Sequence, residues 1–120
     1  MKKKILVFER DMAILEIVAY VLIDEGYHVK ALDNDTSLFE EVMDYMPDAI
    51  LLDIIRPTEE GAEICLMLKK HHKTRHIPVI VYSTHPKVLA TIKDVCADEV
   101  LLKPFDISVL VDAVEAQLEP

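Results

Sequence analysis

The sequence predicts an α/β fold in which a doubly wound, five-stranded parallel sheet is covered by helices on both faces. Short apolar runs alternate five times with longer segments of helical periodicity, which is the pattern of a parallel sheet with crossover helices. Four of the runs are almost continuously apolar, as in strands buried on both faces. The length of 120 residues suits one domain spanning residues 1–120, with no repeat or linker inside it.

The apolar runs place the five strands. They are residues 5–8 (ILVF), 28–32 (HVKAL), 49–52 (AILL), 79–82 (VIVY) and 99–102 (EVLL). Only the second run mixes polar and apolar residues, so we expect it at an edge of the sheet.

The segments between the strands have the periodicity of helices. The first helix is expected at about residues 12–25, with Gly26 suited to its C-terminal cap. The second is expected to start at Ser37, where Glu40 completes a capping box, and to stop before Pro47. The remaining helices are expected at about residues 59–72, 86–96 and 106–118.

The charge and hydropathy of the chain argue against several classes of function. The chain has 22 acidic and 13 basic residues and a net charge of -9, which repels phosphate backbones and anionic membranes. No apolar run approaches the roughly 20 residues of a membrane helix, and the start MKKKILVFERD lacks the apolar length of a secretory signal. We therefore expect a cytoplasmic protein with no direct nucleic-acid or membrane partner.

The chain has two cysteines, Cys65 and Cys96. Both stand in apolar helical segments and lack the CxxC spacing of redox or metal sites. We therefore expect them to pack in the core rather than to form a disulfide.

Polar residues follow four of the five predicted strands at the point where each strand ends. They are Glu9, Arg10, Asp11, Asp53, Ser83, Thr84 and Lys103. Because the carboxyl ends of parallel strands meet at one edge of the sheet, we expect these side chains to form one site.

Three segments carry a resemblance to a known family. They are residues 48–61 (DAILLDIIRPTEEG, with Pro57 and Gly61 in its loop), 77–84 (IPVIVYST) and 101–105 (LLKPF). With them, the chain resembles the CheY-like receiver domain of bacterial two-component response regulators over essentially its whole length. The resemblance implies the flavodoxin-like (βα)5 receiver fold with strand order 2-1-3-4-5. It also implies a cis peptide bond between Lys103 and Pro104.

The same resemblance implies a role for each site residue. Asp53 would be the phosphoacceptor, Ser83 would hydrogen-bond a phosphoryl oxygen, and Lys103 would neutralise its charge. Mg²⁺ would be held by Asp53, by the acidic pair that includes Glu9, and by the backbone carbonyl of Ile55.

The resemblance further implies a signalling switch rather than a turnover enzyme. Its phosphoryl donor would be a sensor histidine kinase or a phosphotransfer protein, and its target a downstream effector protein or domain. The family's usual contact surface is the fourth helix, fifth strand and fifth helix, through which a homodimer is also expected.

Arg10 departs from the family pattern, because it falls on the acidic position that normally ligates the metal. Two unit cations about 4 Å apart repel by roughly 4 kcal/mol at an effective dielectric of about 20, so Mg²⁺ binding should be weakened. In one interpretation Arg10 turns to solvent or pairs with Glu9 or Asp11. In the other, its guanidinium reaches Asp53, replaces part of the metal's charge and holds one state without phosphate. We favour the first.

A second departure concerns the switch that accompanies Ser83. Receivers usually carry a Tyr or Phe that changes rotamer with this hydroxyl residue, but Val100 stands there. For Tyr82 we expect half-buried strand packing. Arg56 adds another cation near the predicted site.

Two functions within this family stay open at this point. One is phosphorelay signalling through Asp53, and the other is a phosphorylation-independent protein-interaction adaptor. A flavodoxin-like cofactor binder would need glycines or hydroxyls after the first strand, where the sequence is FERDMA. A phosphatase would need a second acid two residues past Asp53, where Ile55 stands.

Overall fold

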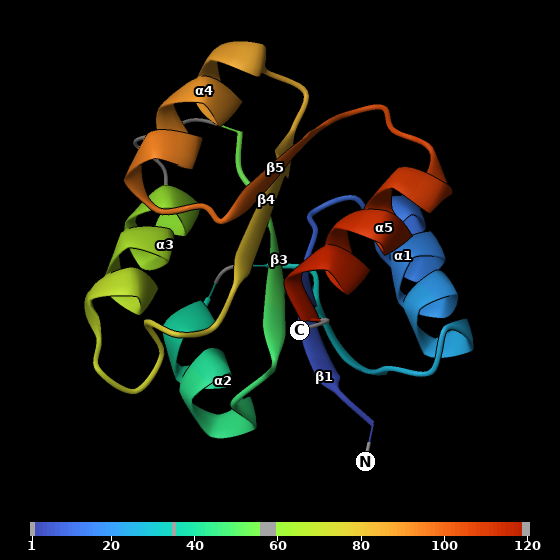
Figure 1. Ribbon diagram of the computed structural model, residues 1–120, viewed down its shortest axis with the longest axis horizontal. Helices are drawn as coiled ribbons and strands as arrows, with labels where there is room; N and C mark the ends of the chain where they lie inside the picture. Colours follow the sequence, from blue (N-terminus) through green and yellow to red (C-terminus); the bar gives the residue numbers. More distant parts are fainter. Residues whose placement is uncertain (1, 35, 56–59, 119–120) are drawn as a thin grey trace.

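The computed structural model describes residues 2–34, 36–55 and 60–118. Arg56 and Pro57, singled out in the sequence, lie outside the described residues. Strands and helices alternate along the chain (Figure 1). The elements are β1 (Lys4–Phe8), α1 (Met12–Asp24), β2 (His28–Leu32), α2 (Leu38–Tyr45), β3 (Ala49–Asp53), α3 (Glu60–Lys70), β4 (Val79–Ser83), α4 (Pro86–Val95), β5 (Glu99–Leu102) and α5 (Ile107–Leu118).

The five strands form one parallel sheet in the order β2-β1-β3-β4-β5, which confirms the predicted fold class and strand order. Every residue of β3 and β4 is buried, because both strands are central and helices cover both faces. β2 lies at an edge, as its mixed composition predicts, and contains exposed and partly buried residues but no fully buried one.

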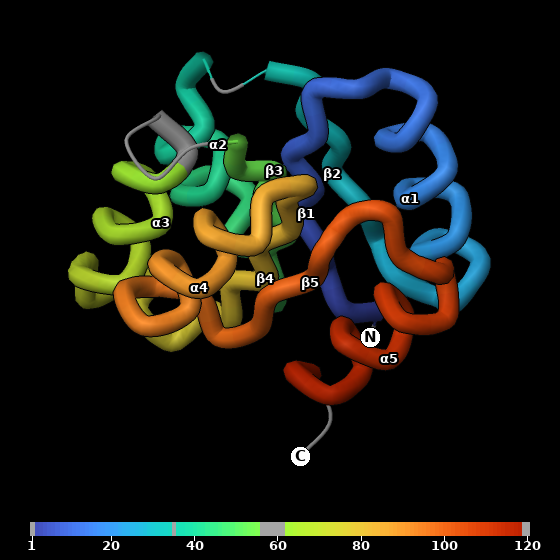
Figure 2. The backbone as a smooth tube through the Cα atoms, turned by 90° about the horizontal axis from the view of Figure 1, so that it is seen from above, coloured from blue at the N-terminus to red at the C-terminus, as the bar shows by residue number. Residues whose placement is uncertain are grey.

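The core consists of two hydrophobic clusters, one on each face of the sheet. α2, α3 and α4 cover one face, and α1 and α5 cover the other (Figure 2). Alternate residues of β1 serve the two clusters: Leu6 and Phe8 join the first, while Ile5 and Val7 join the second. The strands are thereby fixed in position, and so are the residues that follow them.

The ends of two helices differ from the sequence-based expectation. Asp11 caps α1, since its carboxylate accepts hydrogen bonds from the backbone N–H groups of Ala13 and Ile14 at 2.9 and 3.3 Å. The capping box predicted at Ser37 is wrong: Ser37 has φ 61° and its side chain makes no cap hydrogen bond. Gly26 follows α1 with φ 102°, a conformation that glycine adopts without strain, as predicted.

The expectation for the cysteines was half wrong. Cys65 and Cys96 pack in the core, as predicted, but the structure joins them in a disulfide between α3 and the end of α4. Their Cα atoms lie 5.9 Å apart, within the range that a disulfide spans. The missing signal is tertiary: the sheet packs α3 beside α4 and brings together two residues separated by 31 positions.

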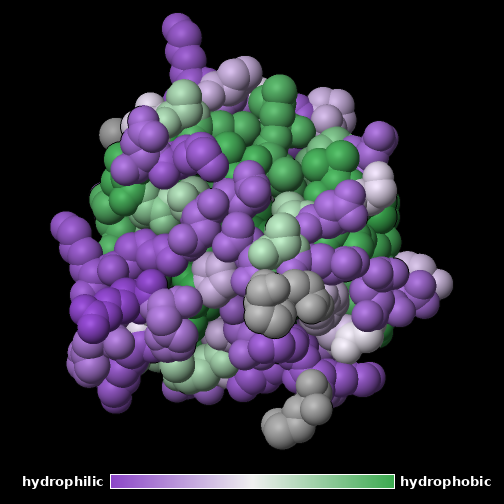
Figure 3. Space-filling view, viewed as in Figure 1, coloured by the Kyte–Doolittle hydropathy of each residue, from purple (hydrophilic) through white to green (hydrophobic). Residues whose placement is uncertain are grey.

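The surface is mixed in character. Hydrophilic side chains interleave with hydrophobic ones across the face shown in Figure 3, and the hydrophobic groups gather mainly in its upper half. Within the described residues, no helix is both long enough and apolar enough to span a membrane.

Candidate functional site

The polar residues that follow β1, β3, β4 and β5 converge at one edge of the sheet, as the sequence predicts. They border a cavity of about 320 Å³. Its lining consists of Glu9, Arg10, Asp11, Ile14, Asp53, Ile55, Ser83, Thr84 and Lys103. The parallel register explains this convergence, because Phe8 pairs with Leu52 and Asp53 pairs with Tyr82, so the three central strands end at one level.

Lys103 links the two buried carboxylates of the site. Its Nζ lies 2.7 Å from Oε1 of Glu9 and 3.1 Å from Oδ1 of Asp53. Glu9 and Asp53 are only 1% and 5% exposed, so both charges depend on protein partners rather than on water. The Lys103–Pro104 peptide bond is cis, as the resemblance implied. The aliphatic chain of Lys103 leads its ammonium over the Tyr82 ring, 4.8 Å from the centroid.

Glu9 occupies a strongly desolvated position. Burial raises the pKa of its carboxyl, the adjacent Asp53 carboxyl adds to this rise, and the Lys103 ammonium opposes it. The second oxygen of Glu9 accepts a hydrogen bond from the backbone N–H of Asp11 at 3.1 Å. Both carboxylate oxygens of Glu9 are therefore engaged by the protein.

Arg10 reaches Asp53, so the interpretation favoured from the sequence was wrong about its direction. Nη1 donates a hydrogen bond to the backbone carbonyl of Asp53 at 2.9 Å and lies 3.5 Å from Oδ2 of its carboxylate. The guanidinium also stands over the Phe8 ring, 4.8 Å from its centroid. Asp53 is consequently flanked by a cation at each carboxylate oxygen.

Of the remaining polar residues at this edge of the sheet, some face the cavity and others stabilise the surrounding structure. Ser83 is buried and faces the cavity, and its Oγ accepts a hydrogen bond from the backbone N–H of His85 at 3.1 Å. Thr84 is exposed, with its hydroxyl 3.1 Å from Nδ1 of His85. The carboxylate of Asp11 caps α1, so it does not replace Arg10 as an acidic metal ligand at the site.

Val100 and Tyr82 are both packed, although differently. Val100 is partly buried against the cluster beneath α2, α3 and α4. Tyr82 is fully buried rather than half-buried, and its hydroxyl donates a hydrogen bond to the carbonyl of Phe8 at 3.2 Å. Its ring meets Phe105 edge to face, with centroids 5.9 Å apart. The packing role expected for Tyr82 is thereby confirmed.

The residues that the resemblance assigns to Mg²⁺ do not fit a divalent cation. The formal charges of Glu9, Asp53, Arg10 and Lys103 cancel, as two negative and two positive groups. A guanidinium about 5 Å from a divalent cation repels it by roughly 7 kcal/mol at an effective dielectric of about 20, before screening by water. Throughout the described ranges, no buried side-chain polar atom lacks a hydrogen-bond partner. Within them, likewise, no three His, Cys, Asp or Glu side chains are grouped to hold a metal.

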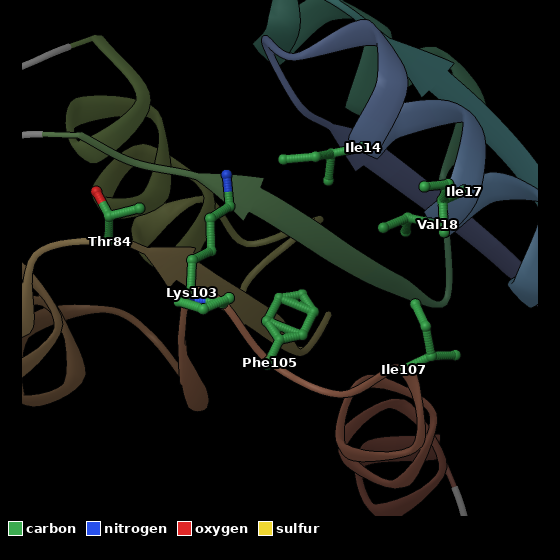
Figure 4. Close-up of a pocket in the computed structure, with 8 residues that line it drawn as sticks. Ile14, Ile17, Val18, Thr84, Lys103, Phe105 and Ile107 are labelled. Atoms are coloured by element: carbon green, nitrogen blue, oxygen red, sulfur yellow. The ribbon is translucent and has the colours of Figure 1, made fainter.

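An apolar pocket adjoins the polar site and was not anticipated from the sequence. It has a volume of about 350 Å³ and lies between α1 and the segment from Lys103 to α5 (Figure 4). Ile14, Ile17 and Val18 of α1 face Phe105 and Ile107 across it, while Lys103 and Thr84 stand at the side nearer the polar site. The sequence feature that could have indicated it is that α1 has more apolar residues than it buries: Ile17, for example, is 54% exposed.

Comparison with known proteins agrees with this geometry. Residues 5–115 match the family model described as the response regulator receiver domain. The DNA-binding dual master transcriptional regulator RpaA of Synechocystis sp. is 30% identical over 117 residues, covering 96% of this chain and 48% of that protein. The phosphate regulon transcriptional regulatory protein PhoB of Klebsiella pneumoniae is 32% identical over 119 residues, covering 97% of this chain and 52% of that protein. The chain thus spans about half the length of these curated relatives.

A solved structure extends the agreement to the backbone. The chemotaxis protein CheY4 of Vibrio cholerae superposes with a TM-score of 0.86, covering 98% of this chain and 100% of that chain. Since the identity is 22%, this likeness concerns the fold alone.

Proposed function

Because the chain belongs to the response regulator receiver domain family, we propose that it accepts a phosphoryl group on Asp53 and changes its protein contacts in response. Receiver domains are signalling switches that work with histidine kinases and effector domains. The observation that carries the proposal is the environment of Asp53. Its carboxylate is 5% exposed, faces the cavity at the end of β3, and lies between Lys103 and Arg10.

In the proposed reaction, a carboxylate oxygen of Asp53 attacks the phosphorus of the donor. The new O–P bond forms as the bond from phosphorus to the leaving group breaks, and the leaving group keeps that electron pair. The ammonium of Lys103, 3.1 Å from Oδ1, offsets negative charge on the transferred group. The hydroxyl of Ser83 accepts from His85 and keeps its own hydrogen to donate to a phosphoryl oxygen.

Metal binding is the part of the family pattern that we do not carry over. Receiver domains generally bind Mg²⁺ at the phosphorylation site. Here Glu9 and Asp53 are engaged by Lys103, and Arg10 supplies a further cation at Asp53. The proposed reaction therefore relies on protein groups alone.

We assign the donor and the output by family membership and by the exposed surface. The donor is a sensor histidine kinase or a phosphotransfer protein, and the receiving partner is a downstream effector protein or domain. The face formed by α4, β5 and α5 is the proposed contact surface, including that of a homodimer. Its exposed apolar residues support this: Val95, Leu102 and Val109 are 50%, 48% and 44% exposed. Because Val100 has no rotating ring, the output does not use an aromatic lever at this position.

A phosphorylation-independent adaptor is not favoured. Such a protein would have no need of a buried carboxylate, a lysine and a hydroxyl around one cavity, yet Asp53, Lys103 and Ser83 are all retained there. Repeated turnover of a phosphate ester is also not proposed, since a stable signalling state requires the aspartyl phosphate to persist.

The test is intact-mass spectrometry after incubation with acetyl phosphate and Mg²⁺. Wild type should gain the mass of one phosphoryl group, and Asp53→Asn should gain none. Asp24→Asn is the matched control, because Asp24 is exposed at the end of α1 and should leave labelling unchanged. An equal adduct on Asp53→Asn, or none on wild type, would contradict the proposed function.

A further inference from the structure

We propose that the Arg10 guanidinium takes the place of the divalent cation, so that Asp53 is phosphorylated without any metal ion. This inference rests on the proposed function. It starts from the disagreement between the residues of this site and the Mg²⁺ that receiver domains generally use. Family membership alone predicts the opposite behaviour, because it predicts a metal-dependent reaction.

Two contacts fix the position of the Arg10 guanidinium. Nη1 donates to the backbone carbonyl of Asp53 at 2.9 Å, and the guanidinium carbon stands 4.8 Å from the Phe8 ring centroid. A backbone acceptor and a fully buried ring are both rigid, so the cation is held beside the carboxylate rather than sampling solvent. The side chain still keeps 31% of its surface exposed and borders the cavity.

This placement suits a phosphoryl group better than a metal. A guanidinium presents planar donors that match phosphoryl oxygens, and it carries its charge at every working pH. With Lys103 at Oδ1 and Arg10 near Oδ2, a phosphoryl group arriving on Asp53 meets a cation on either side. The charge that spreads over its oxygens during transfer is then stabilised by fixed groups.

The step balances without a metal or an added proton. With acetyl phosphate as donor, an Asp53 oxygen forms the new O–P bond and the bond between phosphorus and the acetate oxygen breaks. Acetate leaves with that electron pair and with one negative charge, the same charge that the Asp53 carboxylate gives up on forming the acyl phosphate.

The experiment measures the initial rate of the phosphoryl adduct on the full chain with acetyl phosphate, in EDTA and in Mg²⁺. Wild type should be labelled at similar rates in both. Arg10→Asp, which restores a carboxylate, should be labelled in Mg²⁺ and lose most of its rate in EDTA. Arg10→Gln should lose rate on the order of a hundredfold in EDTA. Arg75→Asp is the matched charge reversal, because Arg75 is exposed outside the site, and it should behave as wild type.

A second readout does not depend on phosphorylation. Amide chemical shifts of ¹⁵N-labelled protein, titrated with Mg²⁺ alone, should stay unchanged around Asp53 in wild type and move in Arg10→Asp. A circular dichroism melt of each variant confirms that it is folded.

The outcomes separate the inference from the proposed function. Labelling of wild type only in Mg²⁺ overturns the inference and leaves the proposed function standing. Labelling of Arg10→Asp with none on wild type overturns both the inference and the proposed function, and shows that Arg10 blocks the reaction. Absence of labelling in every variant rejects the proposed function, and the inference with it.

Discussion

Replacing Lys103 with methionine tests whether the charge arrangement of the site holds in solution. The substitution keeps an unbranched chain of similar length but removes the ammonium. It breaks the 2.7 Å contact to Glu9 and the 3.1 Å contact to Asp53. Asp53 keeps Arg10 as a cationic partner, whereas Glu9, only 1% exposed, loses the ammonium that balances its charge and keeps the backbone N–H of Asp11.

The size of the effect follows from these contacts. Removing one partner of a buried ion pair costs about 3–5 kcal/mol of unfolding free energy. We expect a cost at or below the lower end of this range, about 2–3 kcal/mol. Two features reduce it: Lys103 is 12% exposed and so is partly hydrated, and the raised pKa of Glu9 makes it easier for this carboxyl to bind a proton when the ammonium is absent. With an unfolding entropy of about 2.1 cal/mol/K per residue, this lowers the melting temperature by roughly 8–12 °C.

Urea unfolding at pH 7 and at pH 4 measures the loss. The raised pKa means that the Glu9 carboxyl binds its proton more tightly in the folded state, so it favours folding below the ordinary pKa of 4.5. That contribution disappears as the pH rises through the folded-state pKa, where Glu9 becomes charged and the Lys103 ammonium stabilises its charge. Lys103→Met should therefore lose more stability at pH 7 than at pH 4. Lys87→Met, at an exposed lysine, is the control, and adding Glu9→Gln to Lys103→Met should recover part of the loss. A loss below about 0.5 kcal/mol at pH 7, the usual range for surface changes, would refute the reasoning.

Three further predictions concern the scaffold around the site. Asp11→Ala should lose about 1 kcal/mol of unfolding free energy, because it removes the two cap hydrogen bonds of α1. Asp11→Ser should retain most of the stability of wild type, because serine can also cap a helix. Equal losses in the two variants would contradict the capping role of Asp11. Burial raises the pKa of the Tyr82 hydroxyl well above 10.0, so the neutral hydroxyl favours the folded state. This contribution is complete below pH 10 and is lost as the pH rises through the folded-state pKa. Alkaline absorbance titration should therefore show one tyrosine fewer ionising before unfolding than in the denatured chain, with Tyr82→Phe as the reference; full ionisation in the folded protein would refute this. Finally, intact mass should rise by two hydrogen atoms on reduction, and iodoacetamide in denaturant should label Cys65 and Cys96 only after reduction. Labelling without reductant would show that the pair is not bonded.

The fold was predictable because its signals are local. Four apolar runs and one mixed run contain enough information to place five strands, and the mixed run 28–32 lies at the edge as its polarity requires. The meeting of Glu9, Asp53, Ser83 and Lys103 follows from the same reasoning, because parallel strands align their carboxyl ends.

What the sequence left open depends on side-chain direction and on contacts between distant segments. Arg10 could pair with a neighbour or reach across to β3, and only the position of the Asp53 carbonyl decides between these. Ser37 and Glu40 match a capping box in sequence, but the chain enters α2 in a left-handed conformation that this motif does not use. Asp11 carries the usual signal of an N-cap residue, but its place beside the predicted site equally suggests a role in that site.

The order of the strands has a consequence for synthesis of the chain. β2 pairs with β1, β3 with β1, β4 with β3 and β5 with β4, so each strand after β1 pairs with a strand that has been synthesised before it. The sheet can therefore grow by addition at its edges, without waiting for a later strand to be inserted. Lys103 follows the last strand, whereas Arg10 follows the first. During that growth, Arg10 can contact Asp53 before the final strand brings Lys103 to the site.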